Sequence, residues 1–322
     1  DAQESRGLGD VYKRQDVIPA CMLSILIPTY NFDCSAFVQV LSDQAEALHI
    51  PYEIIVCDDG STDETSKIGN RTINACPNCR FIELPENRGL AHNRNYLASQ
   101  ARYEYFLFLD SDLMPCDNHF IERYINAAQP HSVIGGTIKF RVPGKTGAEE
   151  KANLRYVYAL AREEHSAAER NKSPYTHFSG FSCLIPRSVF ERVRFHEELT
   201  SYGHEDTLYG KDLQANGIAM RYIDNPVFHD IFDSSETFLK KTETGLLNAC
   251  LYRNLMGGHV RILDIQQRCK RAGLQPLIRF LFAIFEKPLR RNLLGEHPKL
   301  RAFDFYKLGY LCRLDHRMKQ TR

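Results

Sequence analysis

Leu23-Ser-Ile-Leu-Ile27, followed at once by Pro28-Thr-Tyr-Asn31, is the clearest structural signal in this chain of 322 residues. A short apolar run that stops at turn-forming residues is typical of a buried strand. The next segment, residues 35–47, has its apolar residues at helical spacing. We therefore expect a strand, a turn and a helix here.

The same order of elements returns further along the chain. A second predicted strand, residues 52–57, runs into Asp58-Asp-Gly-Ser-Thr-Asp63, where Ser61 or Thr62 is expected to cap the next helix. The other elements expected in this region are a strand at 81–84, a helix at 90–102 and a buried strand at 105–109. Alternating strands and helices predict an α/β fold with a mainly parallel sheet and helices on both of its faces.

Conspicuously polar sequences follow three of the predicted strands, at residues 28–31, 58–61 and 110–112. In such sheets ligands bind beyond the carboxyl ends of the strands. One acidic turn alone is explained by a helix cap, but three at one sheet edge indicate a binding site. Two carboxylates spaced i and i+2, as Asp110 and Asp112 are, can hold a divalent cation, Mn²⁺ or Mg²⁺, beside a diphosphate.

The composition, 43% hydrophobic and 25% charged, is ordinary for a folded soluble protein and argues against extensive disorder. No apolar stretch reaches the roughly 18 residues that a membrane-spanning helix needs. No cationic segment followed by an apolar core stands at the start of the sequence. We therefore expect a cytoplasmic protein.

Charge divides the chain into two parts. From Lys240 onward there are 18 Lys and Arg against 6 Asp and Glu, which leaves 23 and 34 for residues 1–239. We expect a catalytic domain at residues 22–235 and a basic, helical region at 236–322. Residues 1–21 are expected to be a non-native or disordered leader, because residues 10–15 read like a translated sequencing adapter placed ahead of Met22.

The polar motifs, taken together and in order, resemble those of the family 2 glycosyltransferases of GT-A fold. The motifs that carry the resemblance are Pro28-Thr-Tyr-Asn31, Asp58-Asp-Gly-Ser-Thr-Asp63, Asn87-Arg-Gly89 with Asn93-Arg94, and Asp110-Ser-Asp112. It covers roughly residues 23–230. The resemblance implies an inverting, metal-dependent transferase that takes a sugar from a nucleotide-sugar donor, with UDP as the nucleotide that the family prefers.

The resemblance also implies a role for individual residues. The nucleotide would be bound by Pro28, Thr29, Tyr30, Asn31, Asp59, Arg88, Arg94 and Asp110. Within this set, Asp59 would contact the base, and Arg88 or Arg94 would approach the ribose or the phosphates. Asp112 would ligate the metal ion together with Asp110 and with His229, which follows a predicted strand at 220–223. A neutral imidazole is a good ligand for manganese and a poorer one for magnesium.

Tyr202-Gly-His-Glu-Asp206 resembles the Glu-Asp motif of the same family. Displacement at an anomeric carbon with inversion needs a carboxylate to take the proton of the acceptor hydroxyl. We expect Asp206 to be this base and Glu205 to orient the acceptor. The alternative is that the pair only caps a helix that starts near Thr207.

Three further residues are expected to contact the acceptor. Gly180 lies in a segment, residues 178–185, that resembles the lining of the acceptor cleft, and it permits close backbone approach. Tyr202 can stack on an apolar sugar face. His204 stands where the family often has a small or aromatic residue, so its contact with the acceptor is the weakest of the three assignments.

The segment at residues 274–294 mixes apolar side chains with Arg279, Lys287, Arg290 and Arg291. This pattern is typical of a helix that lies on an anionic membrane surface, which would place the protein peripherally on the inner face of a membrane. The alternative, equally open, is that the apolar face packs on the catalytic domain. The basic residues are accompanied by no nucleic-acid-binding motif, so nucleic acid is not an expected partner.

The sequence thus predicts glycosyl transfer to a polysaccharide, a lipid-linked glycan or another cell-envelope acceptor. A nucleotidyltransferase is the nearest chemical alternative, but such enzymes usually carry a glycine-rich basic loop where residues 28–31 stand. The lack of a G-x-G-x-x-G sequence after the first strand argues against a dehydrogenase. A non-catalytic sugar-nucleotide-binding or membrane-scaffold subunit stays open, and for it the Glu-Asp pair would be dispensable.

Overall fold

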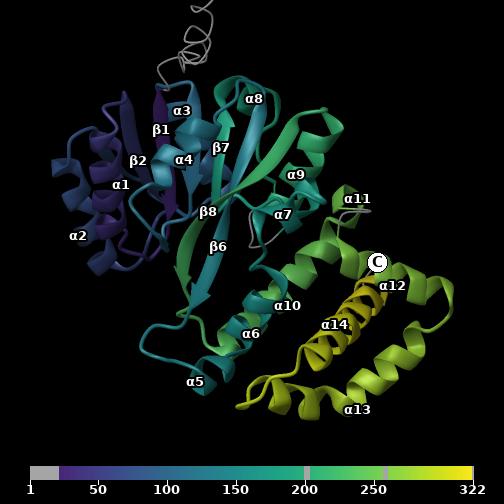
Figure 1. The fold of residues 1–322 in the computed structure, drawn as a ribbon. Coiled ribbons are helices and arrows are strands. Elements are labelled where there is room, and N and C mark those ends of the chain that lie inside the picture. The colour runs from purple at the N-terminus through teal and green to yellow at the C-terminus, as the bar shows by residue number, and fades with distance from the viewer. Residues whose placement is uncertain (1–21, 199–203, 257–259, 321–322) are drawn as a thin grey trace, which may run out of the picture.

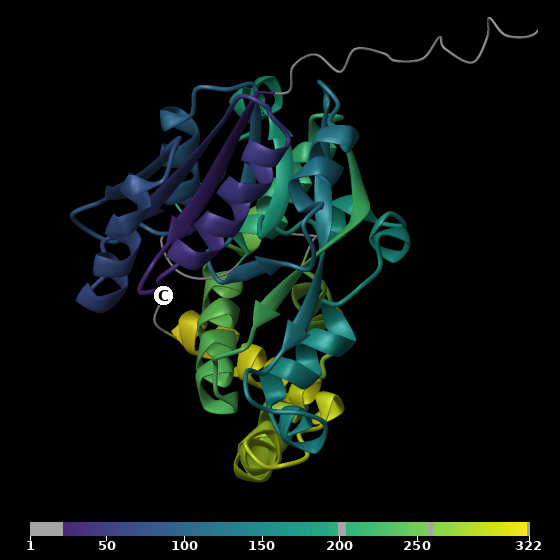
Figure 2. The same ribbon diagram turned by 60° about the vertical axis from the view of Figure 1, so that its left-hand side comes forward.

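The computed structural model describes residues 22–198, 204–256 and 260–320. The expected leader at residues 1–21 and the expected acceptor residue Tyr202 lie outside the described residues. A single sheet with helices on both faces forms the first part of the molecule, and a group of helices lies at one end of it (Figures 1 and 2).

Eight strands form the sheet within the described residues. They are β1 (Leu23–Thr29), β2 (Tyr52–Asp58), β3 (Cys79–Glu83), β4 (Tyr105–Leu109), β5 (Leu113–Pro115), β6 (Ser132–Arg141), β7 (Ser182–Pro186) and β8 (Ala219–Asp230). Their order is β3-β2-β1-β4-β7-β6-β8-β5. The strands β3, β2, β1 and β4 run parallel, β7 is antiparallel to both β4 and β6, β8 is parallel to β6, and β5 is antiparallel to β8. The predicted α/β fold with a mainly parallel mixed sheet is therefore confirmed.

Helices cover both faces of this sheet. They are α1 (Ser35–Ala47), α2 (Glu64–Arg71), α3 (Leu90–Gln100), α4 (Phe120–Ala127), α5 (Ala148–Lys151), α6 (Leu154–Arg162), α7 (Ala167–Arg170), α8 (Arg187–Arg192) and α9 (Glu205–Ala215), with 3-10 turns η1 (Thr72–Ala75) and η2 (Pro174–His177). Successive β1 side chains point to opposite faces, so Ile25 packs with α1 and α4 whereas Leu26 packs with α3. Burial on both faces explains why β1 and β4 read as continuous apolar runs.

Three local expectations are wrong in detail. The helix α2 is capped by Asp63, whose carboxylate accepts from two backbone N–H groups of its first turn, rather than by Ser61 or Thr62. The helix α9 begins at Glu205, two residues before the expected start. The last strand extends far beyond residues 220–223, because β6 continues to pair with β8 past Pro226 after an irregularity between Gly135 and Thr137. Such an irregularity accommodates a proline that cannot donate to the ladder.

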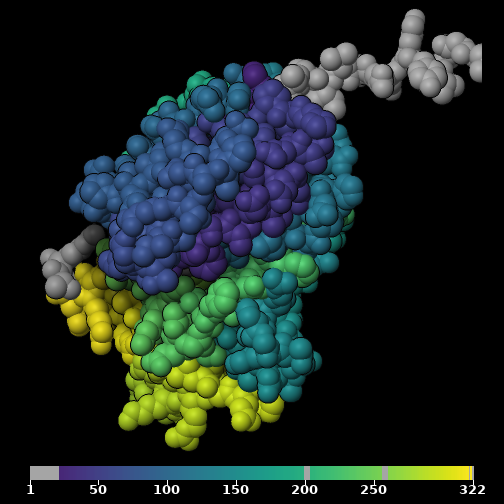
Figure 3. Space-filling model, turned by 90° about the vertical axis from the view of Figure 1, so that its left-hand side faces the viewer, coloured from purple at the N-terminus to yellow at the C-terminus, as the bar shows by residue number. Residues whose placement is uncertain are grey.

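The C-terminal helices are α10 (Ser235–Leu251), α11 (Arg253–Met256), α12 (Arg261–Arg271), α13 (Gln275–Leu293) and α14 (Leu300–Gln320). They surround two apolar clusters of their own. One cluster takes in Leu154 and Tyr158 of α6, and the other takes in Leu208 of α9. In the space-filling view of Figure 3 these helices (yellow and green) lie at the lower end of the molecule, below the first strands and helices (purple and blue). The expected basic helical region is therefore helical, while its boundary at residue 235 stays a prediction.

Candidate active site

A cavity of about 390 Å³ lies beyond the carboxyl ends of β1, β2 and β4. It is lined by Pro28, Thr29, Tyr30, Asp59, Asn87, Gly89, Leu90, Ala91, Asn93, Asp110, Ser111, Asp112 and Glu205. Five of the eight residues expected to bind the nucleotide line this cavity, and Asn31, Arg88 and Arg94 do not. We call it the donor cavity. The rule that ligands bind at this edge of a parallel sheet thus locates it correctly.

Asp59 ties the end of β2 to the start of α3. Its buried carboxylate accepts hydrogen bonds from the backbone N–H groups of Arg88, at 3.0 Å, and of Gly89, at 2.9 Å. Gly60 follows with a φ of +68°, and a Cβ atom there would lie 2.5 Å from the carbonyl carbon of Glu86. Asp59 therefore holds the segment at 87–89 against the cavity, whatever it contacts in a bound nucleotide.

Asn31 joins the loops that follow β1 and β2. Its φ is +52°, a left-handed conformation that asparagine tolerates better than most residues. Its side-chain oxygen accepts from the backbone N–H groups of Thr62, at 2.8 Å, and Asp63, at 3.0 Å, and its own N–H donates to the Ser61 hydroxyl at 2.6 Å. The side chain is thus used between the loops, and its contact with a nucleotide stays a prediction.

Arg94 lies behind the donor cavity with 1% of its side chain exposed. One terminal nitrogen donates to Asp206 Oδ1 and the other to Asp110 Oδ1, both at 2.9 Å. Burial opposes the charge of the guanidinium, but Asp206 and Asp110 outweigh it and raise the pKa of Arg94 above its usual value. The expected contact of Arg94 with ribose or phosphate stays a prediction, since its terminal nitrogens are bonded to the two carboxylates.

The Glu-Asp pair does not cap α9 through its side chains. The N-cap residue is His204, which makes no side-chain capping bond. The carboxylate of Asp206 instead accepts from Arg94 and, at 3.1 Å, from the hydroxyl of Ser179. Glu205 lines the donor cavity, and burial together with the charge of Asp206 raises the pKa of Glu205 to about 7. The pair therefore joins the cavity to Arg94, and the capping alternative does not describe these side chains.

Asp112 and His229 are brought together by the pairing of β5 with β8, in which Leu113 lies opposite His229. The Nε2 atom of His229 lies 2.9 Å from Asp112 Oδ2. Burial lowers the pKa of His229, but the hydrogen bond and charge of Asp112 outweigh it and raise the pKa. Burial likewise raises the pKa of Asp112, and His229 brings it below its usual value. A residue expected from sequence to lie near Asp112 therefore lies beside it, across 117 positions of the chain.

The donor atoms of Asp112 and His229 suit a divalent cation. Asp112 Oδ2 and His229 Nε2 lie 2.9 Å apart, so one cation could take both as ligands in place of the hydrogen bond between them. Carboxylate oxygen with imidazole nitrogen is a set that Mn²⁺ accepts readily. Asp110, the third expected ligand, is bonded to Arg94, and burial raises its pKa. Across the described ranges, no group of three or more His, Cys, Asp or Glu side chains is arranged to hold a metal ion, so an ion here would also need ligands from the diphosphate or water.

Two of the three residues expected to contact the acceptor, Gly180 and His204, belong to the part of the chain that the structure describes. Gly180 packs on Arg94, because a Cβ atom at Gly180 would lie 2.7 Å from the guanidinium carbon. His204 has a φ of +76°. Burial lowers the pKa of its imidazole, although a hydrogen bond to the backbone of Gly245 in α10 acts in the opposite direction. The group that lies close to the Gly180 backbone is therefore the Arg94 side chain. The acceptor contacts of Gly180 and His204 stay predictions.

The sequence matches the model of the family described as Glycosyl transferase family 2 over residues 24–194. The chain belongs to this family. Among curated relatives, it is 42% identical over 188 residues to the teichoic acid poly(glycerol phosphate) polymerase of Staphylococcus epidermidis, covering 56% of this chain and 24% of the relative. It is 32% identical over 206 residues to the poly-beta-1,6-N-acetyl-D-glucosamine synthase of Staphylococcus aureus, covering 62% of this chain and 47% of the relative. The chain thus spans less than half the length of these two relatives.

The solved structure of the mannosyltransferase PcManGT from Pyrobaculum calidifontis, in complex with GDP-Man and Mn²⁺, is similar to this family 2 glycosyltransferase with a TM-score of 0.53. The match covers 92% of this chain and 86% of that one at 13% sequence identity. This likeness concerns the fold, and it confirms the expected GT-A architecture. No helix in the described part of this glycosyltransferase has the length and apolar character that crossing a bilayer requires.

Sequence reasoning missed two residues of this glycosyltransferase site. Ser179 bonds to Asp206, and Asn93 lines the donor cavity while its side-chain nitrogen donates to the Cys57 carbonyl at 2.9 Å. Asn93 stands inside a recognised motif, and its side-chain oxygen is buried without a hydrogen-bond partner. Ser179 has no distinguishing local signal, because only its position beside Gly180 points to it.

Proposed function

We propose that the donor cavity binds a nucleotide-sugar, with UDP as the nucleotide, and that the enzyme transfers the sugar with inversion to a hydroxyl group. One observation carries the proposal. The cavity has acidic residues at the ends of β2 and β4 on one side and Glu205, with Asp206 beside it, on the other. The sheet edge proposed to bind the diphosphate and Glu205 of the carboxylate pair therefore line the same cavity.

The acceptor is proposed to be a polysaccharide, a lipid-linked glycan or another cell-envelope glycan. This class rests on two relatives whose names assign them to the synthesis of a teichoic acid and of poly-beta-1,6-N-acetyl-D-glucosamine. The donor sugar is left to experiment, because selectivity among hexoses depends on a few contacts in the pocket.

Asp206 is proposed as the base. It takes the proton of the acceptor hydroxyl while that oxygen bonds to the anomeric carbon and the bond to the nucleoside diphosphate breaks. Its carboxylate is 23% exposed, and Arg94 and Ser179 hold it in one orientation. Glu205 has a pKa of about 7, so near neutral pH it carries a proton for much of the time and can donate a hydrogen bond to the acceptor.

A divalent cation is proposed to be held by Asp112 and His229, with Asp110 nearby. It would neutralise charge on the departing diphosphate. Manganese is favoured over magnesium because one of the two close ligands is an imidazole.

The test is hydrolysis of a panel of nucleotide sugars, including UDP-GlcNAc and GDP-mannose, with Mn²⁺ or Mg²⁺. Release of the nucleoside diphosphate is measured. We expect one donor to be hydrolysed with metal, and Asp112→Asn to abolish this. Asp43→Asn is the matched control, because Asp43 is an exposed carboxylate on α1 that bonds only to Gln39 among the described residues. Pyrophosphate release from a nucleoside triphosphate and a sugar phosphate would instead identify a nucleotidyltransferase, and metal-dependent binding without any turnover would favour a non-catalytic subunit.

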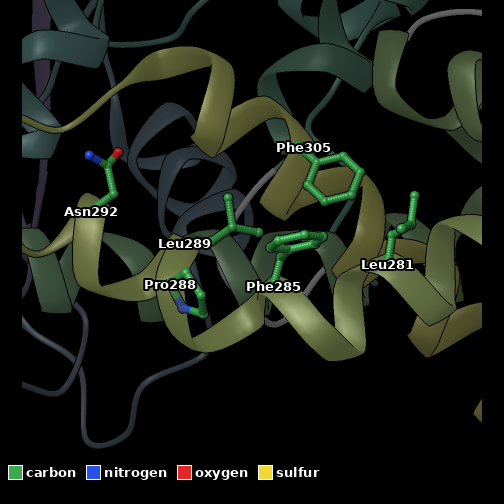
Figure 4. Close-up of a pocket in the computed structure, with 6 residues that line it drawn as sticks. All are labelled: Leu281, Phe285, Pro288, Leu289, Asn292 and Phe305. Carbon is green, nitrogen blue, oxygen red and sulfur yellow. The ribbon is translucent and has the colours of Figure 1, made fainter.

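We also propose that α13 rests on an anionic membrane surface. The residues Leu277, Phe280, Ile284 and Phe285 are exposed at helical spacing along one side of α13, while Phe282 and Leu293 on the other side are buried against α14. The inner side of α13 thus packs on α14, and packing of the apolar face on the catalytic domain stays a prediction. The outer side stays apolar, and Figure 4 shows Leu281 and Phe285 of α13 beside Phe305 of α14 at the edge of a second pocket.

Charge decides which partner fits this apolar side. Lys287 and Arg291 are exposed near its C-terminal end, and Arg268 and Arg271 are exposed at the end of α12 just before it. The inward basic residues Arg290 and Arg313 pair instead with Glu243 and Glu286. Apolar side chains flanked by outward cations fit the headgroup region of an anionic bilayer, where each Lys or Arg contributes about 1 kcal/mol.

Co-sedimentation with vesicles tests the membrane partner. We expect binding to phosphatidylcholine vesicles that contain phosphatidylglycerol, and little binding to phosphatidylcholine alone. The double substitution Phe280→Ser and Ile284→Ser should abolish binding, whereas Ile68→Ser, which alters an exposed apolar residue on α2, should leave it unchanged. Concentration-dependent dimerisation that is lost in the same double variant, without vesicle binding, would assign this surface to a second copy of the chain instead.

A further inference from the structure

We propose that Arg94 is a positioning residue that selects Asp206, rather than Glu205, as the base and fixes it relative to the donor-side carboxylate Asp110. The inference rests on the glycosyl transfer proposed above. Arg94 contacts neither reactant in this assignment and acts through the two carboxylates.

The geometry that carries the proposal is the fork of the guanidinium. Asp110 follows β4 on the donor side and Asp206 lies in the first turn of α9, where 112 positions of sequence separate it from Arg94. The terminal nitrogens of one planar group bond to one oxygen of each, both at 2.9 Å. A rigid fork fixes the distance between its two partners, which a lysine with a single ammonium group cannot do.

Packing leaves the fork little freedom to move. The guanidinium is almost fully buried, the ring of Phe195 lies 5.1 Å from its carbon atom, and the backbone of Gly180 approaches it closely. A buried cation must be compensated by opposite charge, so the two carboxylates and Arg94 hold one another in place. Removing a single member is then expected to disturb the others.

Arg94 also makes the two adjacent carboxyl groups unequal. Asp206 receives hydrogen bonds from the side chains of Arg94 and Ser179, whereas the Glu205 carboxyl group accepts one from its own backbone N–H. Opposite charge and hydrogen-bond donors favour an ionised carboxylate, and burial favours a protonated one. The Asp206 carboxylate is therefore the one that Arg94 and Ser179 orient, which fits it for the role of base. The titratable side chains that interact with Asp206 electrostatically are Arg94 of α3, Asp110 after β4, Cys183 of β7, Glu205 of α9 and Tyr222 of β8.

The experiment compares Arg94→Lys, Arg94→Met and Gly180→Ala with the wild-type enzyme. Hydrolysis of the donor identified in the panel is measured against donor concentration and pH, and UDP binding with Mn²⁺ is measured by calorimetry. Arg170→Lys is the matched control, because Arg170 is also buried but donates to the backbone carbonyls of Glu163 and His177.

We expect Arg94→Lys to lower kcat by about tenfold or more while KM for the donor changes by less than about threefold. Arg94→Met should lower kcat at least as far, because no guanidinium then holds the Asp206 carboxylate in place. Gly180→Ala keeps the charge of Arg94 but displaces its fork, so it should lower kcat in the same direction. If Arg94→Met fails to fold, Gly180→Ala still measures the effect of displacing the guanidinium.

Two outcomes are opposed to the inference. Unchanged kcat in both Arg94→Lys and Gly180→Ala would overturn it, as would an equal loss in Arg170→Lys, which would reduce the effect to the removal of any buried arginine. A wild-type enzyme and an Arg170→Lys variant that hydrolyse no donor would instead refute the proposed function, so the two failures are distinguishable.

Discussion

Replacing Asp59 by asparagine tests how the donor cavity is built. The Asp59 carboxylate accepts from two backbone N–H groups, those of Arg88 and Gly89, and it is buried. An asparagine has one acceptor oxygen, so one buried N–H loses its partner and faces an NH₂ group. A hydrogen bond to a charged acceptor contributes about 1.5–3 kcal/mol. We therefore expect Asp59→Asn to destabilise the protein by about 2 kcal/mol.

Thermal denaturation and calorimetry with UDP measure the two consequences. The melting temperature should fall by about 4 °C, and UDP should bind at least about tenfold more weakly because the segment at 87–89 is no longer held against the cavity. The control is Asp63→Asn. Asp63 likewise accepts from two backbone N–H groups, but at the start of α2, where asparagine caps as well as aspartate. Equal melting temperatures for the two variants would refute the role assigned to Asp59.

Three further predictions concern backbone strain, pH and metal. Gly60→Ala should destabilise the protein by at least about 2 kcal/mol more than Gly144→Ala. Both glycines have a positive φ, but only Gly60 lies against other backbone atoms. Urea denaturation measures the free energy of unfolding of the two variants. Burial raises the folded-state pKa of Glu205 to about 7. The stabilising effect of this group is therefore fully present below the unfolded-state pKa of about 4.3 and is lost as pH rises through 7. The melting temperature, measured from pH 5 to 8, should fall less steeply with pH for Glu205→Gln than for the wild type. His229→Gln should lower the affinity of UDP in Mn²⁺ more than in Mg²⁺, as measured by calorimetry, and an equal loss in both would argue against the imidazole as a ligand.

The donor side of the site could be predicted from sequence because its signals are local. Each parallel strand is a short apolar run, and the residues directly after it must lie at the same sheet edge. Tyr30, Asp59 and Asp110 follow three different strands, and all three line the donor cavity. The position of His229 beside Asp112 was also expected, although this came from family resemblance and not from spacing.

The rest depends on contacts between distant segments, which leave no local pattern. Nothing near Arg94 in the sequence shows that it bridges Asp110 and Asp206, and its buried position became visible only in the structure. The length of β8 was missed because Pro226 reads as a strand terminator, whereas an irregularity in the neighbouring β6 accommodates it. The exposed side of α13 was left open by sequence, since only packing shows which face α14 covers.

The anomeric configuration of the sugar released by hydrolysis tests the central claim most directly. Proton NMR recorded at once after adding the enzyme and Mn²⁺ to an α-linked UDP-sugar distinguishes the two anomers before they interconvert. Single displacement with Asp206 as the base predicts that the β-anomer appears first and that Asp206→Asn releases almost none. Release of the α-anomer first, or undiminished release by Asp206→Asn, would contradict the assignment of an inverting transferase with Asp206 as its base.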